Sequence, residues 1–242
     1  MPPLADAPTC DRLMHELRRC AGSEDLSGAM AAAKRLAALP GDEVPAAMVR
    51  ELISLDSVDL RGDAGDEADA LYRERKALER GLVLCGPRAA SMLQTLLTSA
   101  GAACPAAQVA LRVLAELGDP AALPIARSWL ANTAPEAHLG RLAAIDALGQ
   151  LRPPDAAALL RAALGRPDTV ADSWTKRLTA HALGRLGDVA GLEMLLDDPD
   201  WFARLGAAEA LAALPAGQGE TARARASQDE DPRVASAARP KR

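Results

Sequence analysis

The fold is decided by the stretch ALGRLGDVAGLEMLLDDPDWFARLGAAEAL, residues 182–211. Two Ala/Leu-rich runs are separated by Gly-Asp and then by Asp-Pro, which are typical stop and start signals of helices. We expect Asp198 to cap the second helix, with Pro199 at its first helical position. Trp201 and Phe202 follow at once, and the pair stands out because the chain has only three Trp, one Tyr and one Phe.

The same pattern recurs along the chain. A weaker copy begins at Leu84, where LCGPRAASMLQTLL parallels LGDPAALPIARSWL from Leu117. Each copy predicts two helices joined by a short turn, and one copy cannot bury its apolar face alone, so neighbouring copies must stack into a solenoid. The final spacing, from Leu183 to Leu211, is the shortest and indicates a shortened helix after Gly191. The equivalent leucines are Leu114, Leu148, Leu183 and Leu211, at spacings of 34, 35 and 28 residues.

Composition supports an all-α chain without an evident cofactor or metal. Ala and Leu, both strong helix formers, account for 55 and 37 of the 242 residues. The net charge of −5 argues against nucleic-acid and anionic-membrane partners, which need a basic surface. The four cysteines lie far apart and form no metal or redox motif. The first residues show no signal peptide, and no long apolar run follows, so we expect a cytoplasmic protein.

The quoted stretch resembles HEAT repeats of the short bacterial type that also occur in phycobilin lyases. In that type a helix ending in ALGxLGD leads to a second that begins DPxxxVR and runs into AAxAL, and the resemblance covers roughly residues 84–214. It implies a right-handed α-solenoid of stacked two-helix repeats, whose second helices form a generally concave surface. It also implies a polar ladder between repeats. Asp198 and Arg204 occupy both ladder positions, Arg141 and Lys176 occupy the basic one, and Ala107 interrupts it.

The remaining segments predict the domain organisation. We expect residues 1–65 to form an N-terminal helical cap with amphipathic helices at 9–21, 24–38 and 42–55, and residues 66–242 to form the solenoid with a basic C-terminal tail. The acidic segment 56–70 predicts an exposed loop whose end starts the helix over 71–84. Whether that loop covers the groove stays open. One last short helix is expected after Asp231.

The outward side of the second helices follows from their 100° periodicity. With Leu183 inward, the residues on the opposite side of the same helix are Trp174, Arg177, His181 and Arg185. Neighbouring helices add a matching stripe that includes Leu139, Asp146, Gln150, Arg112 and Glu116. The alternative for the tryptophans, Trp129 included, is that they fill gaps at the thin Ala-rich ends of the stack. The candidate partner-binding residues are Trp174, Arg177, His181, Arg185, Trp201, Phe202 and Glu209.

No arrangement of side chains points to catalysis. His15, His138 and His181 belong to separate segments, and HEAT-like iron enzymes hold their metals with several His-Glu pairs, whereas this chain has only His15-Glu16. No nucleophile with an evident base and no phosphate-binding Gly-rich loop occurs. A HEAT-like DNA glycosylase is disfavoured because it would need a basic groove.

We therefore expect a noncatalytic adaptor or scaffold that binds a protein partner on the second helices. Tryptophan and arginine supply much of the binding energy at protein interfaces. Two alternatives remain open. One is a bilin lyase-like or small-ligand-binding HEAT protein, in which Trp174, Arg177 and His181 would contact a tetrapyrrole. The other is a regulatory subunit of an enzyme complex. The oligomeric state is not predicted.

Overall fold

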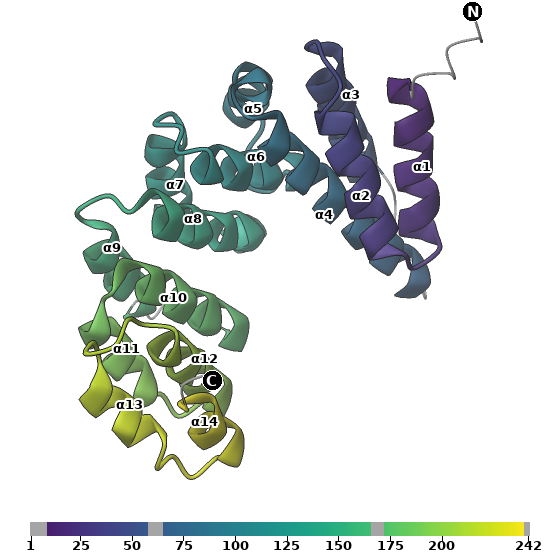
Figure 1. Ribbon diagram of the computed structural model, residues 1–242. Helices are drawn as coiled ribbons and strands as arrows, with labels where there is room; N and C mark the ends of the chain where they lie inside the picture. The colour runs from purple at the N-terminus through teal and green to yellow at the C-terminus, as the bar shows by residue number, and fades with distance from the viewer. Residues whose placement is uncertain (1–8, 58–64, 166–171, 240–242) are drawn as a thin grey trace, which may run out of the picture. The chain divides into compact units, whose positions relative to one another are not determined.

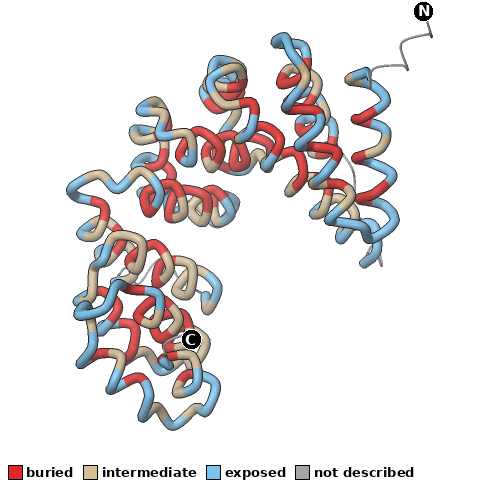
Figure 2. The backbone as a smooth tube through the Cα atoms, in the orientation of Figure 1, coloured by how far each residue is buried: buried red, intermediate tan, exposed pale blue. Residues whose placement is uncertain are grey.

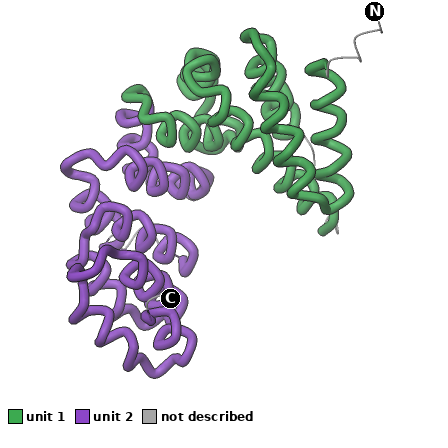
Figure 3. The backbone as a smooth tube through the Cα atoms, viewed as in Figure 1, with its two compact units in different colours: residues 1–121 green, residues 122–242 purple. Residues whose placement is uncertain are grey.

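The computed structural model describes residues 9–57, 65–165 and 172–239, and within those ranges every regular element is a helix (Figure 1). The chain divides into two compact units, residues 1–121 and 122–242 (Figure 3). No described helix has the length and apolar content needed to cross a membrane. The boundary expected between cap and repeats at residue 65 stays a prediction.

The first unit is a series of packed helices that confirms the three helices expected before residue 56. α1 packs on α2, α2 packs on α4, and both α4 and α5 pack on α6. Thr9 caps α1 by accepting from the Arg12 N–H, and Asp25 caps α2 by accepting from the Gly28 N–H. The elements are α1 (Cys10–Gly22), α2 (Leu26–Ala37), α3 (Glu43–Ser54), the 3₁₀ turn η1 (Leu55–Ser57), α4 (Gly65–Cys85), α5 (Pro87–Ser99) and α6 (Pro105–Glu116).

The exposed loop expected over residues 56–70 is wrong at both of its described ends. Asp56 lies in η1, where its carboxylate accepts from the Ala106 N–H at 2.9 Å and from Arg75 Nη2 at 3.0 Å. Helix α4 begins at Gly65, with Asp66 and Glu67 in its first turn. Acidic residues there face the positive end of the helix dipole, so the charge run starts a helix. Residues 58–64 lie outside the described ranges.

The second unit is an α-solenoid of two-helix repeats. The second helices α8, α10, α12 and α14 pack in series, each on the next, while α9, α11 and α13 pack beside them. Buried residues recur from helix to helix within the unit (Figure 2). The elements are α7 (Ala122–Ala131), η2 (Pro135–Ala137), α8 (His138–Leu151), α9 (Ala156–Leu164), α10 (Ser173–Leu186), α11 (Val189–Leu196), α12 (Trp201–Ala212), α13 (Glu220–Ala226) and α14 (Pro232–Ala237).

The aligned leucines are the inward positions, as the repeat predicts. Leu114 is fully buried in the first unit, and Leu148, Leu183 and Leu211 are fully buried in the second. Trp174, on the opposite side of α10 from Leu183, is 66% exposed. Together these observations confirm Leu183 as an inward residue of α10 and Trp174 as an outward one.

Several smaller expectations are settled by the helix bounds. Helix α11 has only eight residues, which confirms the shortened helix after Gly191, and α14 follows Asp231 as expected. Trp129 is buried, so it fills space between helices as the alternative for the tryptophans proposed. Helix α13 was not expected from the sequence, because only its Ala222 and Ala226 are buried and its apolar pattern is weak.

The expected start of α12 is wrong by two residues. The N-cap is Asp200, which accepts from the Phe202 N–H at 2.9 Å, and Trp201 is the first helical residue. Asp198 instead accepts from the Asp200 N–H at 2.9 Å, so it shapes the turn before the helix. Pro199 therefore lies in that turn, outside the helix.

Candidate functional site

Two ion pairs join successive second helices in the positions expected for the ladder. Lys176 Nζ of α10 lies 2.8 Å from Asp198 Oδ2, and Arg204 Nε of α12 lies 2.9 Å from Asp229 Oδ2. Arg204 also donates from Nη1 to the carbonyl oxygens of Asp198 and Pro199, at 3.1 and 3.2 Å. Lys176 thus ties its helix to the turn before the next helix. Arg204 ties its helix to the turn before the next helix and also to the turn before its own.

The turns before α12 and α14 are built alike. In each, the first aspartate accepts from the N–H two residues on and the second caps the helix, with all four distances at 2.9 Å. The pairs are Asp198 with Asp200 and Asp229 with Asp231. The Asp-x-Asp motif therefore sets both the entry of the helix and the acidic partner of the preceding arginine or lysine.

Arg141 takes a different role from Lys176 and Arg204. Its Nη1 donates to the carbonyl oxygens of Asn132 and Ala134, at 2.9 and 2.8 Å, and so fixes the turn before its own helix α8. Ala107 is fully buried in α6 and carries no polar group. The ladder of side-chain ion pairs is therefore described only from α10 onward.

Three aromatic side chains from α10 and α12 form one row. The ring centroids of Trp174 and Phe202 lie 5.2 Å apart at an interplanar angle of 78°, and those of Trp201 and Phe202 lie 5.3 Å apart at 72°. Both are edge-to-face contacts, a favoured geometry for aromatic pairs. Phe202 and Trp201 are half-buried, whereas Trp174 is exposed.

Cations flank the aromatic row. Arg177 Cζ lies 4.6 Å from the Phe202 ring centroid, and Arg233 Cζ of α14 lies 3.4 Å from the Trp201 ring centroid. Both distances lie within the range of cation–π attraction. Trp201 therefore links α12 to α14, while Trp174 extends the row outward into solvent.

Ion pairs continue the surface along α10. Arg177 donates to both carboxylate oxygens of Glu209, with a shortest distance of 2.8 Å, and His181 Nε2 lies 3.4 Å from Glu209 Oε2. Arg185 Nη2 lies 2.6 Å from Asp146 Oδ1 of α8. The structure thus brings all seven candidate residues onto the adjoining helices α10 and α12, which we name the α10–α12 face.

Deprotonation is favoured at His181. Burial lowers its pKa below the ordinary value, the positive charges of Arg177 and Arg185 lower it further, and Glu209 opposes them. The imidazole near neutral pH can therefore act as a hydrogen-bond donor or acceptor without carrying a charge.

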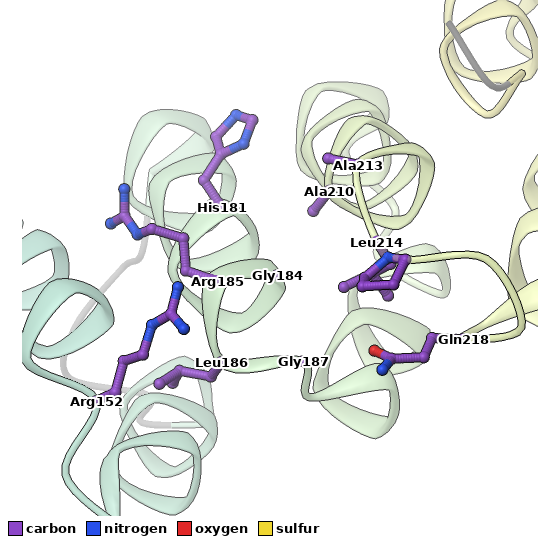
Figure 4. Close-up of a pocket in the computed structure, with 11 residues that line it drawn as sticks. Arg152, His181, Gly184, Arg185, Leu186, Gly187, Ala210, Ala213, Leu214 and Gln218 are labelled. Atoms are coloured by element: carbon purple, nitrogen blue, oxygen red, sulfur yellow. The ribbon is translucent and has the colours of Figure 1, made fainter.

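A pocket of about 540 Å³ lies at the C-terminal end of the α10–α12 face (Figure 4). Arg152, which lines it, ends α8 in the left-handed conformation, with φ 50° and ψ 47°. The sequence reasoning missed this residue, although a signal was present: Gly118 and Gly187 occupy the equivalent place, four residues after the aligned leucines. The pocket is lined by Arg152, His181, Gly184, Arg185, Leu186, Gly187, Ala210, Ala213, Leu214, Pro215 and Gln218.

Among the described residues, no group of three or more His, Cys, Asp or Glu side chains is placed to hold a metal ion. The four cysteines are free thiols, and burial raises the pKa of Cys10, Cys85 and Cys104. A raised pKa keeps a thiol protonated and weakly nucleophilic. These three cysteines therefore show no activation for covalent catalysis.

The repeat architecture and this polar ladder define a class of proteins, the α-solenoids of two-helix repeats. The family model for HEAT repeats matches residues 90–174 and 140–212, which together span just over half of the chain. The chain therefore belongs to the HEAT repeat family. A comparison with curated proteins finds no match. The resemblance to the phycobilin lyase type in particular stays a prediction.

Proposed function

We propose that the protein is a noncatalytic, cytoplasmic adaptor or scaffold that binds a protein partner on the α10–α12 face. HEAT repeats are generally protein-interaction scaffolds and typically noncatalytic. The observation that carries the proposal is Trp174, which is 66% exposed and packs edge-to-face on Phe202. A large apolar side chain held in place at the surface offers a partner contact area at little cost in conformational entropy.

The side chains around Trp174 are also held before a partner arrives. Arg177 is fixed by Glu209 and by the Phe202 ring, so its remaining donors point from a defined place. Preorganised arginine and tryptophan side chains are the kind of residue that dominates binding energy at protein interfaces. His181 and Arg185 supply polar contacts farther along α10, which favour one orientation of the partner.

Substitution of Trp174 tests the proposal. The variants Trp174→Ala and Arg177→Ala should each weaken capture of the partner from the native cell by at least tenfold, since an interface anchor contributes about 2 kcal/mol or more. Met194→Ala is the matched control, because Met194 is 53% exposed but lies on α11, outside the α10–α12 face. Circular dichroism should show the same helix content in all three variants, with a lower melting temperature for Arg177→Ala because it loses its ion pair with Glu209 and its contact with the Phe202 ring. Equal capture by the Trp174 and Met194 variants would rule out Trp174 as an anchor.

A second candidate function is binding of a small ligand such as a bilin. The pocket beside His181 has a volume in the range of ligand sites, which favours this alternative. Titration of the protein with a bilin, followed by absorption spectroscopy, separates the two functions. A saturable spectral shift that Trp174→Ala or His181→Ala removes would support the chromophore class, whereas the adaptor function predicts no such shift.

The remaining alternative is a regulatory subunit. It predicts that the captured partner is an enzyme in fixed stoichiometry whose activity changes when the protein is removed. Purification of the complex from the native cell, followed by an activity assay with and without the protein, measures that outcome.

A further inference from the structure

Arg152 occupies a backbone position that favours glycine. It is one of two described non-glycine residues with positive φ, and at the equivalent place in neighbouring repeats Gly118 has φ 71° and Gly187 has φ 72°. The left-handed region is unfavourable for a residue with a Cβ atom. Arg152 therefore stands in a strained backbone conformation that its counterparts in the neighbouring repeats adopt as glycine.

The guanidinium of Arg152 has no carboxylate partner among the described residues. The ion pairs of the surrounding helices are made by other basic side chains, namely Arg127, His138, Arg161 and Arg185. Arg185, the other cation of the pocket, is already held by Asp146 at 2.6 Å. No aspartate or glutamate lines the pocket, although the chain as a whole carries a net charge of −5. The pocket is thus a basic site on an acidic protein, with Arg152 as its uncompensated charge.

The opposite wall is apolar and small. Figure 4 shows Arg152 on one side of the space and Gln218 on the other, with Leu214 beside Gln218. Gln218 Oε1 lies 3.7 Å from the position that a Cβ on Gly187 would occupy. The side-chain amide of Gln218 is therefore close to the backbone of Gly187, which also lines the pocket. Ala210, Ala213 and Leu214 leave room for an apolar side chain of a ligand.

A charged donor facing a small apolar wall has a defined chemical complement. An arginine fork pairs best with a planar carboxylate, which it binds through two parallel hydrogen bonds. The last residue of a peptide carries a carboxylate and a side chain on the same Cα atom. A C-terminal apolar residue therefore presents both groups within the space of this pocket.

We propose that the pocket binds the C-terminal carboxylate of the partner, with the partner's last side chain apolar and packed against Leu214 and Pro215. The proposal rests on the proposed function, because it names the part of the partner that this end of the α10–α12 face receives. His181 lies in both the pocket and the face, so the two are continuous. Arg185 lies eleven positions after Trp174 on α10, about 17 Å along the helix axis. A partner segment of about five extended residues spans that length.

Short peptides test the proposal directly. The probe is an N-acetylated tripeptide of two alanines and a C-terminal leucine, compared with the same peptide as its C-terminal carboxamide. Binding is followed by the amide chemical shifts of Gly184 and Gly187 in the full chain. We expect saturable shifts with the free carboxylate and at least tenfold weaker binding of the carboxamide.

The variant Arg152→Gly makes the test independent of folding. Glycine suits the left-handed backbone at this position, so the variant should unfold at an equal or higher urea concentration than the wild type while binding the tripeptide at least tenfold more weakly. Arg225→Ala is the matched control, since Arg225 is half-exposed on α13 and outside the pocket. This control should bind the tripeptide as the wild type does.

Four results would overturn the proposal. Equal binding of the carboxylate and the carboxamide would show that the pocket does not recognise the negative charge of the peptide C-terminus. Unchanged binding by Arg152→Gly would remove the proposed anchor. Tighter binding of an amidated peptide with glutamate as its last residue would assign the pocket to acidic side chains. If the tripeptide fails while Trp174→Ala still abolishes partner capture, the proposed function stands and only the C-terminal site falls.

Discussion

Arg204 is a buried cation of the second unit, and its hydrogen bonds run in both directions along the ladder. It bonds Asp229 ahead of it and the carbonyl oxygens of Asp198 and Pro199 behind it. Its own guanidinium thus joins the entry of α12 to the entry of α14. Burial raises the pKa of Asp229, but the hydrogen bonds from Arg204 and from the N–H of Asp231 together outweigh it and hold that pKa below its ordinary value.

Removal of Arg204 should cost more stability than removal of a surface arginine. Arg204→Ala leaves the half-buried Asp229 without its cation and the carbonyl oxygens of Asp198 and Pro199 without their donor, so we expect a loss of roughly 2 kcal/mol. Arg225→Ala removes an ion pair with the exposed Asp197 and should cost under about 1 kcal/mol. Urea unfolding measures both. Equal losses would contradict a structural role for Arg204 in the ladder.

Glu74 is the buried acid of the first unit. Its side chain lies on α4, where burial and the nearby carboxylate of Glu51 raise its pKa to about 7. Arg18 pairs with Glu51 and lies 3.9 Å from Glu74 Oε1, which only partly offsets the rise. The folded protein therefore holds a proton on Glu74 more tightly than the unfolded chain does.

The contribution of Glu74 to the stability of the folded state should consequently fall as the pH rises from about 4.5 to above 7. The unfolded chain releases the proton near pH 4.5 and the folded protein only near pH 7, so the stabilisation is complete below the first value and lost above the second. Glu74→Gln removes this titration. The difference in unfolding free energy between variant and wild type should grow by on the order of 2 kcal/mol between pH 4.5 and pH 8, after allowance for solvent screening. A difference that stays constant with pH would show that Glu74 titrates normally.

At the scale of the elements, glycine and alanine allow α10 and α12 to pack closely. A Cβ on Gly206 would lie 2.9 Å from the Cα of Arg177, and one on Gly184 would lie 2.9 Å from the Cβ of Ala210. The same closeness appears between α8 and α10, where a Cβ on Gly149 would lie 2.9 Å from the Cβ of Ala182. This spacing brings Trp174 within reach of Phe202 and Arg177 within reach of Glu209.

Widening that spacing should disturb both stability and the face. Gly206→Ala improves helix propensity by about 1 kcal/mol but forces a methyl group against the Arg177 backbone, so we expect a net loss of about 1 kcal/mol or more. Gly165→Ala is the control, since its added Cβ would meet its nearest atom at 3.8 Å. Differential scanning calorimetry should show a lower Tm for Gly206→Ala alone. A raised Tm would mean that the two helices tolerate a larger separation.

At the scale of the whole molecule, the repeat made most of the fold predictable. Leu114, Leu148 and Leu183 recur at nearly equal spacing and Leu211 follows after a shorter one, and this recurrence allows inward and outward sides to be assigned without coordinates. The aromatic row followed from the same periodicity. The roles of individual residues within the row did not, because the partner of Trp201 is Arg233 of α14, and the repeat pattern does not specify that contact.

Three features lay beyond sequence reasoning for physical reasons. Asp56 reads as part of an acidic loop, and only the fold brings the Ala106 N–H to it from fifty residues away. The burial of Glu74 depends on the packing of α4, which its charged sequence conceals. The pocket that Arg152 and Gln218 line from opposite sides arises because the turn after α12 lies next to the end of α10, a contact between segments that the repeat pattern does not specify.

The central claim is that a protein partner covers the α10–α12 face, and amide hydrogen exchange of the protein with and without its captured partner tests it most directly. Exchange should slow in α10 and α12 and in the 213–218 turn, while α9 and α11 keep their rates. Protection confined to α9, α11 or the first unit would contradict the claim.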